Sequence, residues 1–178
     1  MSENSKELIS TILYILAVVI VSFLIVRYVG QRTEVIGSSM VPTLEDGDQL
    51  ITDKISYRFS DPQRFDIVVF PYEPADAFYI KRIIGLPGET VSIDDNGKIY
   101  INGEHLDESY GYGFTEPMDI EGTEVKLGDD EYFVMGDNRE VSMDSRFEEV
   151  GSITRDELLG RAFVRIFPFN KVGLLKHQ

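Results

Sequence analysis

A serine that could act as a nucleophile lies in residues 37–43, which read Gly-Ser-Ser-Met-Val-Pro-Thr. Ser39 precedes a Met-x-Pro segment and follows shortly after a long apolar stretch. A serine hydroxyl is almost fully protonated near neutral pH, so it attacks a carbonyl only where a nearby base takes its proton. The chemistry of Ser39 therefore depends on a partner base elsewhere in the chain.

Lys81 is the candidate base, in residues 78–84, whose pattern is that of a strand interrupted by two charges. Side chains alternate across a strand, so one of Lys81 and Arg82 is expected among apolar neighbours on a core-facing side. Burial disfavours an ammonium and lowers its pKa, whereas a guanidinium stays protonated. Only Lys81 could thus become a neutral base. The ordinary alternatives are an edge strand whose lysine deters aggregation, or a lysine that reaches out to water.

A third cluster occupies residues 136–146, which read Gly-Asp-Asn-Arg-Glu-Val-Ser-Met-Asp-Ser-Arg. It combines turn-forming residues, hydroxyls and charges of both signs. A hydroxyl here could orient an amine, and an Asp–Arg pair could hold the loop in place. The alternative interpretation is a surface loop held by salt bridges.

Composition excludes several other kinds of site. The net charge of −14 argues against a nucleic-acid partner. The absence of cysteine excludes disulfides, a thiol nucleophile and thiolate metal sites. With only His105 and His177 present, a zinc site is not expected, and a Ser39–His105 triad is disfavoured because His105 follows an exposed turn at residues 102–104. We expect neither a metal nor an organic cofactor.

The elements that must position these residues begin with an apolar run at residues 8–26 that carries no charge. At about 1.5 Å per residue a helix of this length can cross a hydrocarbon core of roughly 30 Å. A cleaved signal peptide would have a shorter apolar region behind a basic segment, which residues 1–7 do not provide. We therefore predict a short tail at 1–7 and an uncleaved anchor at 8–29.

The rest of the chain, residues 30–178, is predicted to be a mostly β domain. Segments that alternate in polarity are residues 33–37, 48–55, 66–70, 78–84, 90–93, 98–101, 131–135 and 161–167. Asn96-Gly97 predicts a hairpin with a type I′ turn. Helical periodicity beyond the anchor is limited to about one turn at 155–159, and residues 106–127 are expected to form a polar surface excursion.

Together these features resemble the type I signal peptidases, which are membrane-anchored Ser/Lys proteases that remove signal peptides from exported preproteins. The resemblance is carried by residues 38–44, 47–50, 66–70, 79–89 and 136–146, in the family's order and behind the anchor. It implies a fold of coiled antiparallel β-sheets. It also implies cleavage of N-terminal signal peptides after small residues of an Ala-x-Ala pattern, through an acyl-enzyme.

The resemblance assigns roles by position. Ser39 would be the nucleophile, Lys81 the general base and Ser142 the residue that orients the lysine amine. The site would be braced by Asp137, Asp144 and Arg146, and the pocket residues would be Val35, Met40, Leu44, Val69, Tyr79 and Ile80. The backbone N–H of Ser39 would meet the oxyanion. Where some family members place a second hydroxyl donor, this chain has Gly37, so that donor stays unassigned.

The resemblance also implies a location and partners. The short span between the lysine motif and the last motif is typical of compact members with a single anchor, common in Gram-positive bacteria. The catalytic domain would lie on the extracytoplasmic face of the cytoplasmic membrane, close to the secretion translocase. Arg27 and Arg32, which follow the apolar run, weakly favour the opposite orientation. We nevertheless expect the extracytoplasmic orientation, because the substrates of the family emerge on that side of the membrane.

Other functions remain open at this stage. One is a peptidase that matures a dedicated export or conjugation substrate. Another, of a different class, is a catalytically silent, membrane-tethered β domain that binds peptides. A self-cleaving Ser/Lys regulator is disfavoured, because an anchor stands where such a protein would carry a DNA-binding domain.

Overall fold

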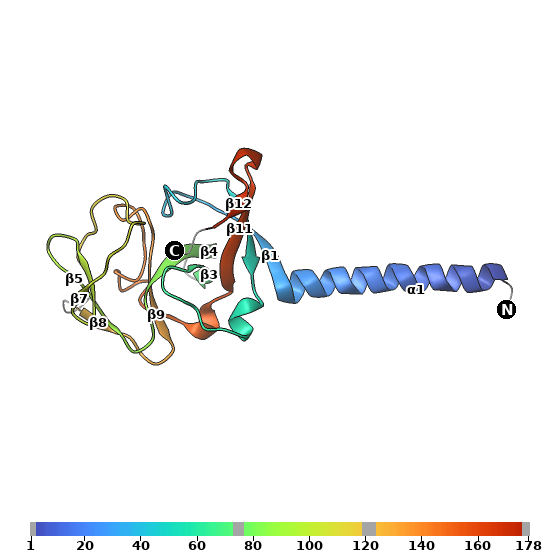
Figure 1. Ribbon diagram of the computed structural model, residues 1–178, viewed down its shortest axis with the longest axis horizontal. Helices are drawn as coiled ribbons and strands as arrows, with labels where there is room; N and C mark the ends of the chain where they lie inside the picture. The colour runs from blue at the N-terminus through green and yellow to red at the C-terminus, as the bar shows by residue number, and fades with distance from the viewer. Residues whose placement is uncertain (1–2, 73–76, 119–123, 176–178) are drawn as a thin grey trace.

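A computed structural model describes residues 3–72, 77–118 and 124–175, as a β-rich body with one long helix projecting from it (Figure 1). The helix α1 (Glu3–Leu24) continues into a π-helical turn, η1 (Ile25–Val29). The most apolar 18-residue window within residues 6–29 has a mean hydropathy of 2.9, and none of that window is buried by the rest of the chain. By length and composition the helix can cross a membrane. It begins at Glu3, inside the segment that the sequence predicts to be a tail.

The larger sheet is antiparallel and follows directly from the helix. Its strands are β1 (Gly30–Glu34), β2 (Gln49–Asp53), β3 (Ile67–Tyr72), β4 (Ala77–Gly85), β9 (Glu131–Met135), β10 (Ile153–Thr154), β11 (Gly160–Phe167) and β12 (Gly173–Leu174). Their order is β1-β2-β11-β3-β4-β9-β10, with β12 paired to β11. Strand β4 thus lies between β3 and β9, in the interior of the sheet.

The smaller sheet lies at the end of the body far from the helix (Figure 1). It contains β5 (Thr90–Ile93), β6 (Ile99–Ile101), β7 (Glu104–His105) and β8 (Glu124–Lys126), in the order β7-β6-β5-β8. His105 is exposed on its edge strand, and its ring centroid lies 5.7 Å from that of Tyr100. Short 3-10 turns occur at Ser56–Arg58 (η2), Arg155–Glu157 (η4) and Phe169–Lys171 (η5).

The fold class predicted from the sequence is confirmed, and each predicted strand has a counterpart. The type I′ turn, however, is at the next hairpin, where Asn102 and Gly103 have φ of 53° and 81°. At the predicted position only Gly97 has a positive φ, because the Asp94 carboxylate accepts the backbone N–H groups of Asn96 and Lys98 and closes a different turn.

The predicted excursion at 106–127 is irregular over 106–118 and ends in β8, which pairs with β5. Residues 119–123 of that prediction lie outside the described residues. The excursion also reaches the loop that follows β9. The backbone N–H of Tyr112 donates to Asp137 O at 2.7 Å, and that of Arg139 donates to Tyr112 O at 2.9 Å. These contacts join the excursion to the third sequence cluster.

Candidate active site

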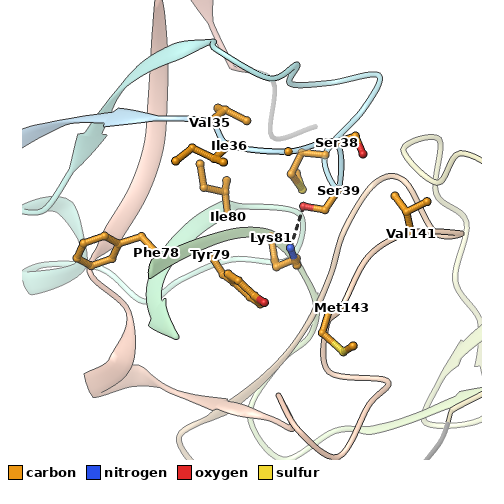
Figure 2. Close-up of a pocket in the computed structure, with 12 residues that line it drawn as sticks. Val35, Ile36, Ser38, Ser39, Phe78, Tyr79, Ile80, Lys81, Val141 and Met143 are labelled. Carbon is orange, nitrogen blue, oxygen red and sulfur yellow. Dashed lines mark hydrogen bonds between the residues drawn. The ribbon is translucent and has the colours of Figure 1, made fainter. Parts of the chain in front are cut away.

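Ser39 and Lys81 meet in a surface cleft. Ser39 lies in the loop between β1 and β2, and Lys81 lies in β4. Lys81 Nζ donates a hydrogen bond to Ser39 Oγ over 2.9 Å, as Figure 2 shows. The loop is fixed at its base, where Gly37 N–H donates to the Asp46 carboxylate at 2.7 Å. A hydroxyl within hydrogen-bond reach of an amine is an arrangement able to perform acyl transfer.

Lys81 is almost completely removed from water, with 3% of its surface exposed. Burial lowers the pKa of its amine from 10.5 to about 8. The nearby positive charge of Arg146 lowers this pKa further, whereas the negative charge of Asp144 opposes the shift. An amine with a pKa near 8 is partly neutral at physiological pH, which is what a general base requires.

Asp144 and Arg146 form a buried ion pair behind the lysine. Arg146 Nε donates to Asp144 Oδ1 at 2.8 Å, and neither side chain is more than 1% exposed. A second guanidinium nitrogen of Arg146 donates to the carbonyls of Arg139 and Ser142 at 2.8 and 3.2 Å. Asp144 Oδ2 in turn accepts the backbone N–H of Gly136 at 3.0 Å. The pair therefore fixes the backbone of the loop at several points.

Asp137 forms a second buried ion pair, with Arg82. Arg82 donates from Nε and from a terminal nitrogen to the two Asp137 carboxylate oxygens, at 2.8 and 2.6 Å, and both side chains are fully buried. Thr43 Oγ1, four residues after the serine, donates to the same carboxylate at 2.5 Å. The network links the serine loop, β4 and the loop after β9. Lys81 and Arg82 are both buried, and the Asp137 carboxylate compensates the charge of Arg82.

Ser142 lies beside the pair, and its side chain is buried at 3% exposure. Among the described residues its Oγ has no hydrogen-bond partner, so the predicted contact with the Lys81 amine is not recorded. Its position is defined by Gly136. A Cβ on Gly136 would collide with Ser142 Oγ and lie 2.5 Å from the carbonyl oxygen of Ser39. Only a glycine allows the backbone at this position to lie so close to the Ser39 carbonyl and the Ser142 side chain.

The serine backbone is held by a residue that the sequence interpretation did not name. Asn138 donates its backbone N–H to Ser39 O at 3.0 Å and its side-chain amide to Ser38 O at 3.2 Å. The only signal for it in the sequence is its place in the third cluster. Gly37 has a φ of 87°, and a Cβ there would meet nothing within 4 Å. A side chain at this position would thus be disfavoured by backbone conformation rather than by crowding.

The cleft has a volume of about 220 Å³ and contains four of the predicted pocket residues in its lining: Val35, Met40, Tyr79 and Ile80. The other two, Leu44 and Val69, have no exposed surface and do not line it. They pack in the hydrophobic cluster beneath, which also contains Val35, Met40 and Ile80. Side chains that line the cleft but were not predicted are Ile36, Phe78, Val141 and Met143.

Comparisons with known proteins identify the family of this chain. A family model described as signal peptidase, peptidase S26, matches residues 6–167. A probable signal peptidase I-2 from Synechocystis sp. is 46% identical over 165 residues, which are 88% of this chain and 72% of that protein. A signal peptidase I from Bacillus amyloliquefaciens is 40% identical over 173 residues, 91% of this chain and 86% of that protein.

A crystallised signal peptidase I from Enterococcus faecalis V583 is 36% identical to this chain. The structural match covers 57% of this chain and 97% of the Enterococcus chain, with a TM-score of 0.47. On the family model and the curated relatives, the chain belongs to the signal peptidase family, peptidase S26, and is an enzyme of the signal peptidase I type.

Proposed function

We propose that this protein is a membrane-anchored endopeptidase that removes N-terminal signal peptides from exported preproteins, with Ser39 as nucleophile and Lys81 as general base. The observation that carries the proposal is the hydrogen bond of 2.9 Å between a buried lysine amine and a serine hydroxyl in a surface cleft. A solvated lysine would hold its proton near neutral pH, so burial is what gives this amine its function.

The mechanism follows from the two side chains. Neutral Lys81 takes the proton of Ser39 while the hydroxyl oxygen attacks the carbonyl carbon of the scissile bond. The resulting tetrahedral oxyanion accepts a hydrogen bond from the backbone N–H of Ser39. When the carbon–nitrogen bond breaks, the Lys81 ammonium returns the proton to the leaving amine. Water, deprotonated by Lys81, then releases the signal peptide from the acyl-enzyme and restores the serine.

The preference for small residues follows from the cleft. An extended preprotein segment that adds a strand beside residues 78–81, the part of β4 that β9 does not pair, presents alternate side chains to the same wall. The first and third residues before the scissile bond would therefore enter the hollow lined by Val35, Met40, Tyr79 and Ile80. Val35, Met40 and Ile80 are buried in the core and cannot move aside for a larger side chain, which favours alanine at both positions. Leu44 and Val69 pack beneath the residues that line this hollow.

The surrounding charges have a positioning role in this proposal. The pairs Arg82–Asp137 and Arg146–Asp144 hold the elements that carry Ser39 and Lys81 at a fixed separation. Ser142 is proposed to orient the lysine amine when substrate closes the cleft. Its buried Oγ has no hydrogen-bond partner among the described residues, so it can accept a hydrogen bond from the amine.

The apolar helix supports a single-pass anchor in the cytoplasmic membrane. We propose that the β domain lies on the extracytoplasmic face, near the secretion translocase, where signal peptides emerge. The helix places the start of the β domain only a few residues from the membrane surface, because β1 begins at Gly30, directly after η1.

The test is cleavage of a preprotein by the full chain reconstituted in liposomes, with the cleavage site read by N-terminal sequencing. The expected product begins directly after an Ala-x-Ala sequence. Replacement of either alanine by leucine should reduce the rate by at least about 100-fold, because Val35, Met40 and Ile80 belong to the core and cannot move aside without loss of packing. A preprotein that binds but is never cut would instead support the silent peptide-binding domain. Cleavage of only one particular substrate would support a dedicated maturation enzyme.

A further inference from the structure

The cleft has a second wall, formed by Val141 and Met143. Both line the cleft together with Ser39 and Lys81, and both are apolar side chains that stay exposed, at 59% and 42%. Figure 2 shows them across the Ser39–Lys81 pair from Val35, Ile36 and Phe78. A single exposed apolar side chain needs no explanation, but two that face one cleft beside a reactive pair mark a contact surface.

This second wall is held rigidly. Val141 and Met143 flank the buried Ser142, and both of their side chains are exposed. The backbone N–H groups of Val141 and Ser142 both donate to Asn138 O, at 3.4 and 3.1 Å. The carbonyl of Ser142 accepts from the buried Arg146. Apolar side chains on a braced loop are ready to contact a ligand without a large loss of conformational entropy.

We infer that Val141 and Met143 bind the residues that follow the scissile bond, and that they favour apolar over acidic side chains there. The inference rests on the proposed function. An extended chain whose scissile carbonyl lies at Ser39 Oγ must place its two halves on opposite sides of the reactive pair. The hollow for small residues takes the half before the bond, so the half after it meets the second wall.

The preference for apolar residues follows from the chemistry of that wall. A leucine that covers the exposed surface of Val141 and Met143 removes apolar area from water on both partners. An aspartate there would lose hydration against these apolar side chains. The acidic chain as a whole, with a net charge of −14, provides no compensating attraction.

The experiment uses the full chain in detergent micelles and three peptides that are identical up to the scissile bond. The two residues after the bond are Leu-Leu, Gly-Gly or Asp-Asp, and mass spectrometry verifies the site of cleavage. For the wild type we expect kcat/KM for Leu-Leu to exceed that for Gly-Gly by about 3- to 10-fold, with Asp-Asp lowest. In the double variant Val141→Ser/Met143→Ser the Leu-Leu to Gly-Gly ratio should fall close to one.

Ile36→Ser is the matched comparison, since Ile36 is an exposed residue of the opposite wall. It should leave the Leu-Leu to Gly-Gly ratio as it is in the wild type, because the ratio cancels any effect common to both peptides. If the ratio changes in Ile36→Ser and not in the double variant, the residues after the scissile bond contact the opposite wall, and the inference is overturned. An unchanged ratio in all variants would overturn it too. Failure of the wild type to cut any peptide would count against the proposed function itself.

Discussion

Replacement of Lys81 by methionine should make the domain more stable while it removes the base. The amine is buried, and its pKa is lowered from 10.5 to about 8. Below pH 8 the folded protein holds a proton on a desolvated amine. Each unit of the lowered pKa corresponds to about 1.36 kcal/mol, so the protonated amine reduces the free energy of unfolding by about 3 kcal/mol. Methionine has a similar length and carries no charge. Loss of the hydrogen bond to Ser39 offsets about 1 kcal/mol, so we expect a net gain of about 2 kcal/mol at pH 7.

The pH dependence of this gain has a definite sign. Between about pH 8 and 10.5 the unfolded lysine still binds a proton that the folded one has released, so the wild type gains stability as the pH rises. The advantage of Lys81→Met should therefore be largest below pH 8 and should shrink by pH 9.5. Urea unfolding of the full chain in micelles, followed by circular dichroism, gives the difference, and Lys126→Met is the control at an exposed strand lysine. The reasoning is refuted if Lys81→Met is less stable than Lys126→Met at pH 7, or if its gain is the same at both pH values.

Three further perturbations test the site. The kcat/KM for peptide cleavage should rise about tenfold per pH unit up to about pH 8 and then level off, because only the neutral Lys81 amine can take a proton. A flat profile of kcat/KM from pH 6 to 9 would contradict this. Gly136→Ala should lower kcat by more than about 100-fold, since its Cβ has no room, whereas Gly173→Ala, with nothing within 4 Å, should retain wild-type rates. Arg82→Met should cost about 3–5 kcal/mol in urea unfolding, because it leaves a buried carboxylate unpaired, whereas Arg32→Met, in an ion pair more than half exposed, should cost less than about 1 kcal/mol. Equal losses for the two arginine variants would show that burial does not determine their energies.

The strands and the reactive pair could be predicted because their signals are local. Strand periodicity located β4, and the motif around Ser39 required a base that only a buried lysine could supply. The short strands β7, β8, β10 and β12 contain two or three residues each, too few to show a period. They form because a longer neighbour offers them backbone hydrogen bonds.

The partners within the site were harder to predict, since they depend on packing between distant segments. Alternation did not show that Arg82 is buried as well as Lys81, because its burial depends on the buried carboxylate of Asp137, 55 residues later in the chain. Leu44 and Val69 are as apolar as the residues that line the cleft, so residue type could not show that they lie one layer deeper. The place of Val141 and Met143 was also hidden, because the sequence of a charged loop does not show which of its side chains turn outward.

The central claim is that Ser39 and Lys81 together perform the cleavage. The most direct measurement is the single-turnover rate of preprotein cleavage by Ser39→Ala and Lys81→Met, with Ser38→Ala as the neighbouring control and urea unfolding as the check on folding. We expect the first two variants to fold and to lose activity by at least about 1,000-fold, since each removes an indispensable part of one proton transfer. Ser38→Ala should cleave at a rate within a few-fold of the wild type. Wild-type turnover by a folded Ser39→Ala or Lys81→Met protein would contradict the account.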